Sequence, residues 1–144
     1  MVDDHMQTSA PGIFACGNVV HVHDIVDEVT LAAQIAGNHA STFTHAKPSP
    51  MHNILLKTGR NASYVIPHTL HFIDEDNITV YFRVAQVAEG VVIMVVDDET
   101  EAVLHQEEMR IVSPPEMVKI RVSSSQLTGV KQAIRIDIQE KKND

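Results

Sequence analysis

Apolar and polar residues alternate along several short segments in the second half of the chain. The alternation is clear over 78–85, 118–122 and 134–139, where Val, Ile or Phe occupies every second position. A period of two places successive side chains on opposite faces of a strand, so these segments are predicted to be strands with one buried face. The wholly apolar run at 91–96 lies between Gly90 and Asp97 and predicts a central strand.

Residues 63–140 carry about six or seven short predicted strands, counting briefer segments at 103–104 and 109–112. Acidic or Gly/Pro turns separate these strands at roughly ten-residue intervals, which is typical of an antiparallel sandwich. We predict a mainly β fold with an immunoglobulin-like antiparallel β-sandwich over 63–140. The chain has one cysteine and no tryptophan, so the Cys…Trp…Cys hallmark of true immunoglobulin domains is missing, and the prediction depends on the strand pattern.

A different pattern occupies the beginning of the chain. The apolar run at 13–16 lies between Gly12 and Gly17, which predicts a strand that enters a tight turn. Asp24 is a good candidate for the N-cap of a helix, because carboxylates also occupy the first turn that would follow it. We predict this helix over about 24–40. Its apolar residues recur at helical spacing on one narrow face: Ile25, Val29, Ala32 and Ala36.

The segment between these two regions is rich in turn-forming residues. Pro48, Pro50 and Gly59 lie among Ser, Thr, His and Lys, with one short apolar turn at 54–56. We therefore divide the chain into a strand–helix region at 1–45, a linker at 46–62 and the β-sandwich at 63–140.

The stretch Thr8–Asn18, which reads T-S-A-P-G-I-F-A-C-G-N, is the most informative part of the sequence. It resembles the second flavin-binding motif of the pyridine-nucleotide-disulfide oxidoreductase superfamily, T-x-x-P-G-I-[FY]-A-x-G-D, which a helix follows at once. The runs at 17–27 and 114–119 are similar to one subgroup, the FAD/NAD dehydrogenases related to the alpha subunit of sarcosine oxidase and to glycerol-3-phosphate dehydrogenase-associated proteins. The resemblance implies that residues 1–45 are the strand–helix remnant of an FAD-binding α/β fold, followed by a β-rich extension.

The same resemblance implies cofactor contacts at four positions. Gly17 would let the backbone approach the flavin because it lacks a Cβ, and Asn18 would hydrogen-bond the ribityl chain, where the family usually has a charged Asp. The helix start at His23 and Asp24 would face the isoalloxazine ring, because a helix dipole favours the negative charge that gathers there on reduction. The hydride chemistry belongs to the flavin, so no residue of this chain is predicted to be catalytic.

Two parts of such an enzyme are absent from these 144 residues: the G-x-G-x-x-G turn that binds the FAD pyrophosphate, and a redox-active C-x-x-C pair. The family places both upstream, together with the NAD(P) site. We therefore predict a C-terminal fragment of an FAD-dependent pyridine-nucleotide oxidoreductase that is inactive alone, with FAD and NAD(P) bound only in the full-length parent. The alternative is a self-standing β-sandwich interaction module, or subunit, that docks on a separate flavoprotein.

Partners and location follow from exposed surface and charge. An orphaned strand and helix would leave apolar residues partly exposed, so the predicted partners are the remainder of the flavoprotein, a partner subunit or further copies of the chain. These residues are Ile13, Phe14, Val29 and Ile35. The net charge of −8 argues against nucleic acid, and no apolar run approaches the roughly 20 residues of a membrane helix. One cysteine and an acidic N-terminus without a signal peptide predict a cytoplasmic location.

Other features admit both a structural and a functional interpretation. His21 and His23 form an H-x-H pair that could contact the flavin edge or a partner, bind a metal, or be structural; the sequence names no third ligand, so no metal site is predicted. Cys16 is interpreted as a buried, inert thiol. The acidic run at 97–101 is interpreted as a solvated hairpin turn. The basic residues of the strands are interpreted as a solvated sheet face: Lys119, Arg121, Lys131 and Arg135.

Overall fold

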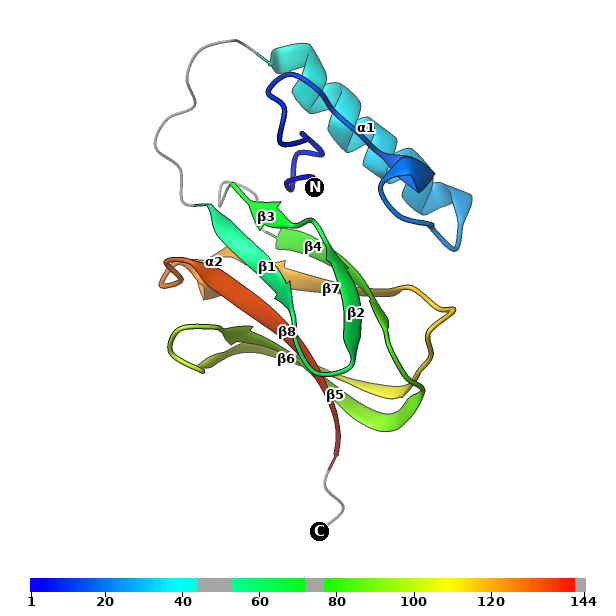
Figure 1. The fold of residues 1–144 in the computed structure, drawn as a ribbon, viewed down its shortest axis with the longest axis vertical. Coiled ribbons are helices and arrows are strands. Elements are labelled where there is room, and N and C mark those ends of the chain that lie inside the picture. The colour runs from blue at the N-terminus through cyan, green and yellow to red at the C-terminus, as the bar shows by residue number, and fades with distance from the viewer. Residues whose placement is uncertain (44–52, 72–76, 142–144) are drawn as a thin grey trace.

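A computed structural model describes residues 1–43, 53–71 and 77–141. The elements, in chain order, are η1 (Gly17–Val19), α1 (Val26–Thr42), β1 (Ile54–Thr58), β2 (Ala62–Ile66), β3 (Thr69–Leu70), β4 (Asn77–Val84), β5 (Ala88–Asp97), β6 (Val103–Val112), β7 (Val118–Ser123), α2 (Ser124–Leu127) and β8 (Ala133–Glu140). Figure 1 shows α1 and the N-terminal segment together on one side of the strands. In the described part of the chain, no helix is long and apolar enough to span a membrane.

The strands form two sheets. One has five strands in the order β3-β1-β8-β5-β6, and the other has three in the order β2-β4-β7. Neighbouring strands are antiparallel except β1 and β8, which run parallel. The prediction of a mainly β fold is confirmed, because the alternating segments at 78–85, 118–122 and 134–139 correspond to β4, β7 and β8, and the apolar run at 91–96 lies in β5.

One hydrophobic core lies between the two sheets. Val80 and Phe82 of β4 face Ile93 of β5 and Ile134 of β8 across it, and each of these side chains has an exposed fraction of zero. The alternation seen in the sequence is therefore the alternation between this core and the opposite face of each sheet. Both sheets contribute to the same core, so neither sheet could bury its apolar face without the other.

The expected linker at 46–62 contains β1, which belongs to the five-stranded sheet. Leu55 is in register with Ala133 and Leu56 with Ile134, and the side chains of Ile54 and Leu56 are buried. The β region thus begins at β1, earlier than residue 63. The five-residue strand ends in the polar Lys57-Thr58, so its pattern was too short to distinguish from a turn.

Two short strands were expected at 103–104 and 109–112, but the structure has one ten-residue strand, β6. It pairs with β5 along most of its length, from Val103 opposite Val96 to Val112 opposite Ala88. Polar residues in the middle of β6 concealed the strand, since an edge strand can carry charged side chains without burying them.

The N-terminal arm, residues 1–43, covers the outer face of the three-stranded sheet, which is the face directed away from the core. Val2, Met6, Ala32 and Ala36 of the arm are buried there against Ile66 and Tyr81 of the sheet. The small alanines on the narrow apolar face of α1 therefore pack on this sheet. The strand and helix had been expected to lack a sheet to pack on.

The arm differs from its prediction in two local respects. Residues 13–16 do not form a named strand; they follow an extended path in which the amide of Ala15 donates to the Met6 carbonyl at 2.9 Å. The helix begins at Val26 instead of Asp24, with Ile25 as an N-cap that makes no side-chain hydrogen bond. It also continues past Gly37 to Thr42, because one glycine lowers helix stability without ending a helix.

Candidate functional site

The residues singled out for cofactor contact lie in one short segment between the extended part of the arm and α1. Gly17 begins this segment with a φ of +67°, a left-handed conformation that glycine adopts without strain. Its carbonyl accepts hydrogen bonds from the amides of Val20 at 2.9 Å and His21 at 3.3 Å, which closes the turn of η1. A Cβ at Gly17 would lie 3.4 Å from Cγ1 of Val29, so the turn packs directly on α1.

Asn18 follows at the exposed tip of this turn. Its Oδ1 accepts a hydrogen bond from the amide of His23 at 3.4 Å. Three of the predicted positions, Gly17, Asn18 and His23, thus belong to one folded turn. The next residue, Asp24, points to a different set of contacts on the sheet.

Asp24 connects the segment to the three-stranded sheet. Its Oδ1 accepts from Nη2 of Arg83 at 2.5 Å, and its Oδ2 accepts from the amide of Met117 at 2.6 Å. The hydrogen bond from Met117 and the neighbouring Arg83 hold the pKa of Asp24 below its usual range. Because both carboxylate oxygens are engaged in this way, Asp24 does not cap α1, and the expectation that it does is wrong.

Arg83 of β4 is the central residue of the junction, and sequence reasoning did not identify it. Its guanidinium donates five hydrogen bonds: from Nε to the Tyr64 hydroxyl at 3.1 Å, from Nη2 to the Val22 carbonyl at 3.0 Å and to Asp24, and from Nη1 to the carbonyls of Pro114 and Pro115. The acceptors come from the arm, from β2 and from the loop before β7. The only sequence signal was its outward position in the alternation of β4.

Glu28 of α1 makes a second connection. Its carboxylate accepts from the Tyr81 hydroxyl at 2.7 Å and from the ammonium group of Lys119. Lys119 lowers the pKa of Glu28, while burial, followed by the hydrogen bond to Glu28, raises the pKa of Tyr81. Lys119 therefore belongs to the arm–sheet junction, and the interpretation of this residue as part of a solvated face is wrong.

The same correction applies to Arg135 on the other sheet. Its guanidinium contacts Glu101 at 2.8 Å, Asp98 at 2.9 Å and Asp137 at 3.1 Å. The acidic turn at 97–101 is thus an ion-pair partner of β8 as well as a hairpin turn. A cation of the chain already occupies this acidic cluster.

The two histidines of the H-x-H pair lie between these connections. Their ring centroids are 4.1 Å apart, and the ring of His21 lies 5.7 Å from that of Tyr81 and 6.0 Å from that of Tyr64. Burial, followed by the charges of His23 and Arg83, lowers the pKa of His21 to about 4, and burial also lowers the pKa of His23. Both rings are therefore neutral at physiological pH.

A metal site does not emerge from these residues. Across 1–43, 53–71 and 77–141, no three or more His, Cys, Asp or Glu side chains are grouped closely enough to hold a metal ion. Cys16 is a half-buried free thiol that packs against the apolar side of the arm. The H-x-H pair is brought together with tyrosines and an arginine, which are contacts that fix structure.

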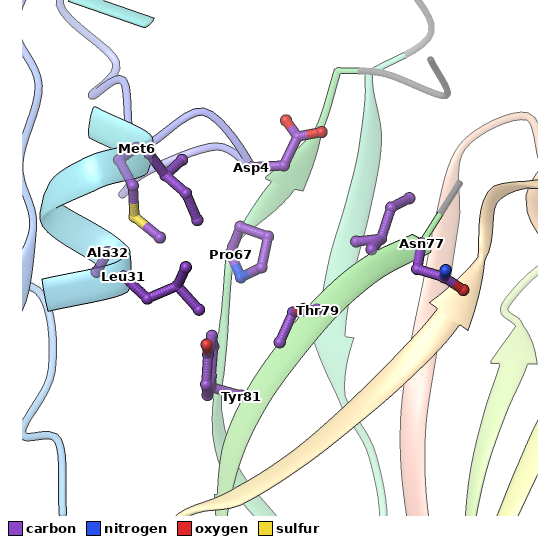
Figure 2. Close-up of a pocket in the computed structure, with 10 residues that line it drawn as sticks. Asp4, Met6, Leu31, Ala32, Pro67, Asn77, Thr79 and Tyr81 are labelled. Carbon is purple, nitrogen blue, oxygen red and sulfur yellow. The ribbon is translucent and has the colours of Figure 1, made fainter. Parts of the chain in front are cut away.

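The arm and the sheet enclose a small pocket next to this junction (Figure 2). Leu31 and Ala32 of α1 line one side, and Thr79 and Tyr81 of β4 line the other. Its volume of about 60 Å³ corresponds to a few water molecules and is too small for a flavin ring. A shallower hollow opens over the junction itself, lined by Val20, His21, Val22, Asp24, Tyr64, Arg83 and Pro115.

Comparison with protein families, with curated proteins and with solved structures found no match to this chain.

Proposed function

We propose that this chain is the C-terminal part of an FAD-dependent pyridine-nucleotide oxidoreductase and that it is inactive alone. The observation that carries the proposal is the T-x-x-P-G-I-F-A-x-G motif ending at Gly17, a residue in a left-handed turn with an exposed polar side chain next to it. The left-handed conformation of Gly17 lets the turn pack closely on α1 and leaves Asn18 exposed, where a cofactor could reach its side chain.

In this proposal the residues of the motif have separate tasks. Asn18 hydrogen-bonds the ribityl chain, because its side chain is at the exposed tip of the turn. Asp24 acts indirectly: its carboxylate is held by Arg83 and Met117, so it positions the segment instead of touching the flavin. The β region would therefore be the support that holds the flavin-binding turn in place.

The remainder of the flavoprotein, or a partner subunit, would cover the exposed side of the arm. Six of the exposed large apolar residues lie within a short stretch of the arm: Ile13, Val19, Val22, Ile25, Val26 and Leu31. We propose that residues 1–45 are the remnant of the FAD-binding fold, with α1 as its helix, and that the β region is the immunoglobulin-like sandwich that follows it. Exposed apolar residues in this number favour contact with another protein segment.

The proposed inactivity is tested by titrating FAD with the purified chain and following flavin fluorescence. We expect no saturable quenching at micromolar concentrations, because the chain lacks a G-x-G-x-x-G turn for the pyrophosphate. Stoichiometric micromolar binding would overturn the proposed inactivity.

The proposed parentage is tested on the gene. A G-x-G-x-x-G strand–turn–helix encoded upstream in the same reading frame is the expected result. In that full-length protein, Asn18→Ala should weaken FAD binding by about tenfold, the effect of one lost hydrogen bond. Asn38→Ala, at an exposed position near the end of α1, is the matched control and should leave FAD affinity unchanged. An independent start site beside a complete, separate flavoprotein gene would contradict the parentage.

A second candidate function is a β-sandwich interaction module that docks on a separate flavoprotein. The observation in its favour is the core between the two sheets, which is buried without any contribution from the arm. Mixing the chain with that flavoprotein distinguishes the two: a complex of defined stoichiometry in size-exclusion chromatography favours the module.

A further inference from the structure

The histidine pair, His21 and His23, lies at the place where the arm meets the sheet, with His21 buried and His23 half-buried. His21 has an exposed fraction of 9%. Among the described residues, the Nδ1 atoms of these two histidines are the buried side-chain atoms that lack a hydrogen-bond partner. A buried imidazole in this environment is favourable only while it is uncharged, because a proton on the ring would add a charge with little solvation.

The groups around the pair come from every element packed against it. The arm supplies Asp24, α1 supplies Glu28, β2 supplies Tyr64, and β4 supplies Tyr81 and Arg83. The carboxylates of Asp24 and Glu28 are already hydrogen-bonded, to Arg83 and Met117 in one case and to Tyr81 and Lys119 in the other.

We propose that the histidine pair is an acid-sensitive contact, which holds the arm on the three-stranded sheet while both rings are neutral and releases the arm when they take up protons. The proposal goes beyond the oxidoreductase function and does not depend on it. Release would expose the outer face of the sheet around Tyr64 and Tyr81 and free the turn at Gly17 from its support.

The direction of the pH effect follows from proton binding. In the docked state the pKa of His21 is about 4, below the ordinary value of 6.5, so the released state binds protons more readily. The equilibrium constant for docking of the arm therefore falls as pH drops below about 6.5, and it stops falling near pH 4. Over that interval, proton uptake by His21 alone lowers the docking equilibrium constant by roughly 300-fold, since each unit of pKa difference is a factor of ten.

The carboxylates at the junction have pKa values below their ordinary ranges. Hydrogen bonds from Lys119 and Tyr81 lower the pKa of Glu28, and those from Met117 and Arg83 lower the pKa of Asp24. The shifts of both carboxylates therefore run in the direction that favours their ionised forms in the docked state. His68 contributes in the same direction at the other end of the arm: its Nδ1 accepts from the Val2 amide at 3.0 Å, and burial lowers its pKa.

Tyrosine spectroscopy tests the proposal directly. The chain has two tyrosines and no tryptophan, and both tyrosines, Tyr64 and Tyr81, lie at the arm–sheet contact. The near-UV circular dichroism of tyrosine thus reports docking of the arm, and far-UV circular dichroism reports the β-sheets. On titration from pH 7 to pH 4 we expect a reversible tyrosine transition within the window, with the sheet signal retained.

Three variants complete the experiment. The double variant His21→Gln/His23→Gln keeps neutral polar side chains and should move the midpoint down by at least one pH unit. His105→Gln on β6, away from the arm, should keep the midpoint of the parent chain. His68→Gln should shift the midpoint less than the double variant does. A double variant with an unchanged midpoint would overturn the proposal.

A measurement on the unaltered chain covers the case in which the double variant does not fold. Imidazole resonances in NMR spectra give the pKa of each histidine. We expect His21 to titrate well below the ordinary histidine range, together with the tyrosine transition. A tyrosine signal that stays constant to pH 4, or an ordinary pKa for His21, would refute the acid-sensitive contact.

Discussion

At the scale of single residues, Arg83 concentrates the interactions between the arm and the sheet. Its side chain is only 15% exposed and donates to acceptors in the arm, in β2 and in the loop before β7. A planar guanidinium can serve acceptors in several directions at once, which a lysine ammonium on a flexible chain does less well. The junction therefore depends on the shape of this group as well as on its charge.

Replacing Arg83 should loosen the arm more than any other single polar change. We expect Arg83→Gln to weaken the docking of the arm on the sheet by about 2–3 kcal/mol, because charge-assisted hydrogen bonds are lost and Asp24 loses its cationic partner. Urea titration followed by near-UV tyrosine circular dichroism measures the loss. Arg110→Gln on the exposed part of β6 is the control, with an expected change below about 0.5 kcal/mol. Equal effects of the two changes would show that Arg83 is not the central contact.

Two glycines of the arm should respond to alanine in opposite ways. Gly17→Ala should lower the free energy of unfolding by about 1–3 kcal/mol, because the φ of +67° at this position is strained for a residue with a Cβ. Gly37→Ala should raise the free energy of unfolding by about 0.5–1 kcal/mol, since Gly37 lies inside α1 and no atom lies within 4 Å of the added Cβ. Thermal and urea unfolding of both variants provide the comparison. Destabilisation by the second change would show that the helix does not extend through Gly37.

At the scale of elements, the position of β1 decides where the β region begins. It adds a parallel strand beside β8, so the first and last strands of the region are neighbours. The sequence of this strand has five residues and only two buried ones, Ile54 and Leu56. These residues form a strand because β8 provides the neighbouring strand with which they pair.

Neighbouring positions in β1 offer a matched test of this pairing. Ile54→Ala should cost about 2–5 kcal/mol of unfolding free energy, because its side chain is buried to 1% in the core. Leu55→Ala should cost less than about 1 kcal/mol, because Leu55 is 43% exposed on the other side of the strand. Chemical denaturation followed by far-UV circular dichroism checks both. Similar losses in the two variants would be inconsistent with β1 as an alternating strand of the core.

At the scale of the whole molecule, the arm has one covered side and one uncovered side. The covered side packs on the three-stranded sheet, and the uncovered side presents Val19 and Val26 at exposed fractions of 81% and 73%. Exposed apolar residues of this kind favour association with another protein surface. We therefore expect the uncovered side of the arm to be the part of the molecule that binds a partner or a further copy of the chain.

The uncovered side should cause the isolated chain to self-associate. We expect the mass measured by light scattering to rise with concentration and to fall towards the monomer in Val19→Ser/Val26→Ser, which removes exposed apolar area without touching the core. Val87→Ser, at another exposed valine outside the arm, is the control and should leave association unchanged. A monomeric mass of the unaltered chain over a wide concentration range would contradict this expectation.

The sequence by itself determined most of the strands, because alternation with a buried face is a local property of β4, β7 and β8. It also located the turn at Gly17, since a left-handed conformation favours glycine. Only the tertiary structure decided which partners Asp24 and Glu28 have: Arg83 is 59 residues from Asp24, and Lys119 is 91 residues from Glu28. Contacts between residues so far apart in sequence produce no periodic pattern that could be recognised. A carboxylate looks the same in the sequence whether it caps a helix, faces a cofactor or connects an arm to a sheet.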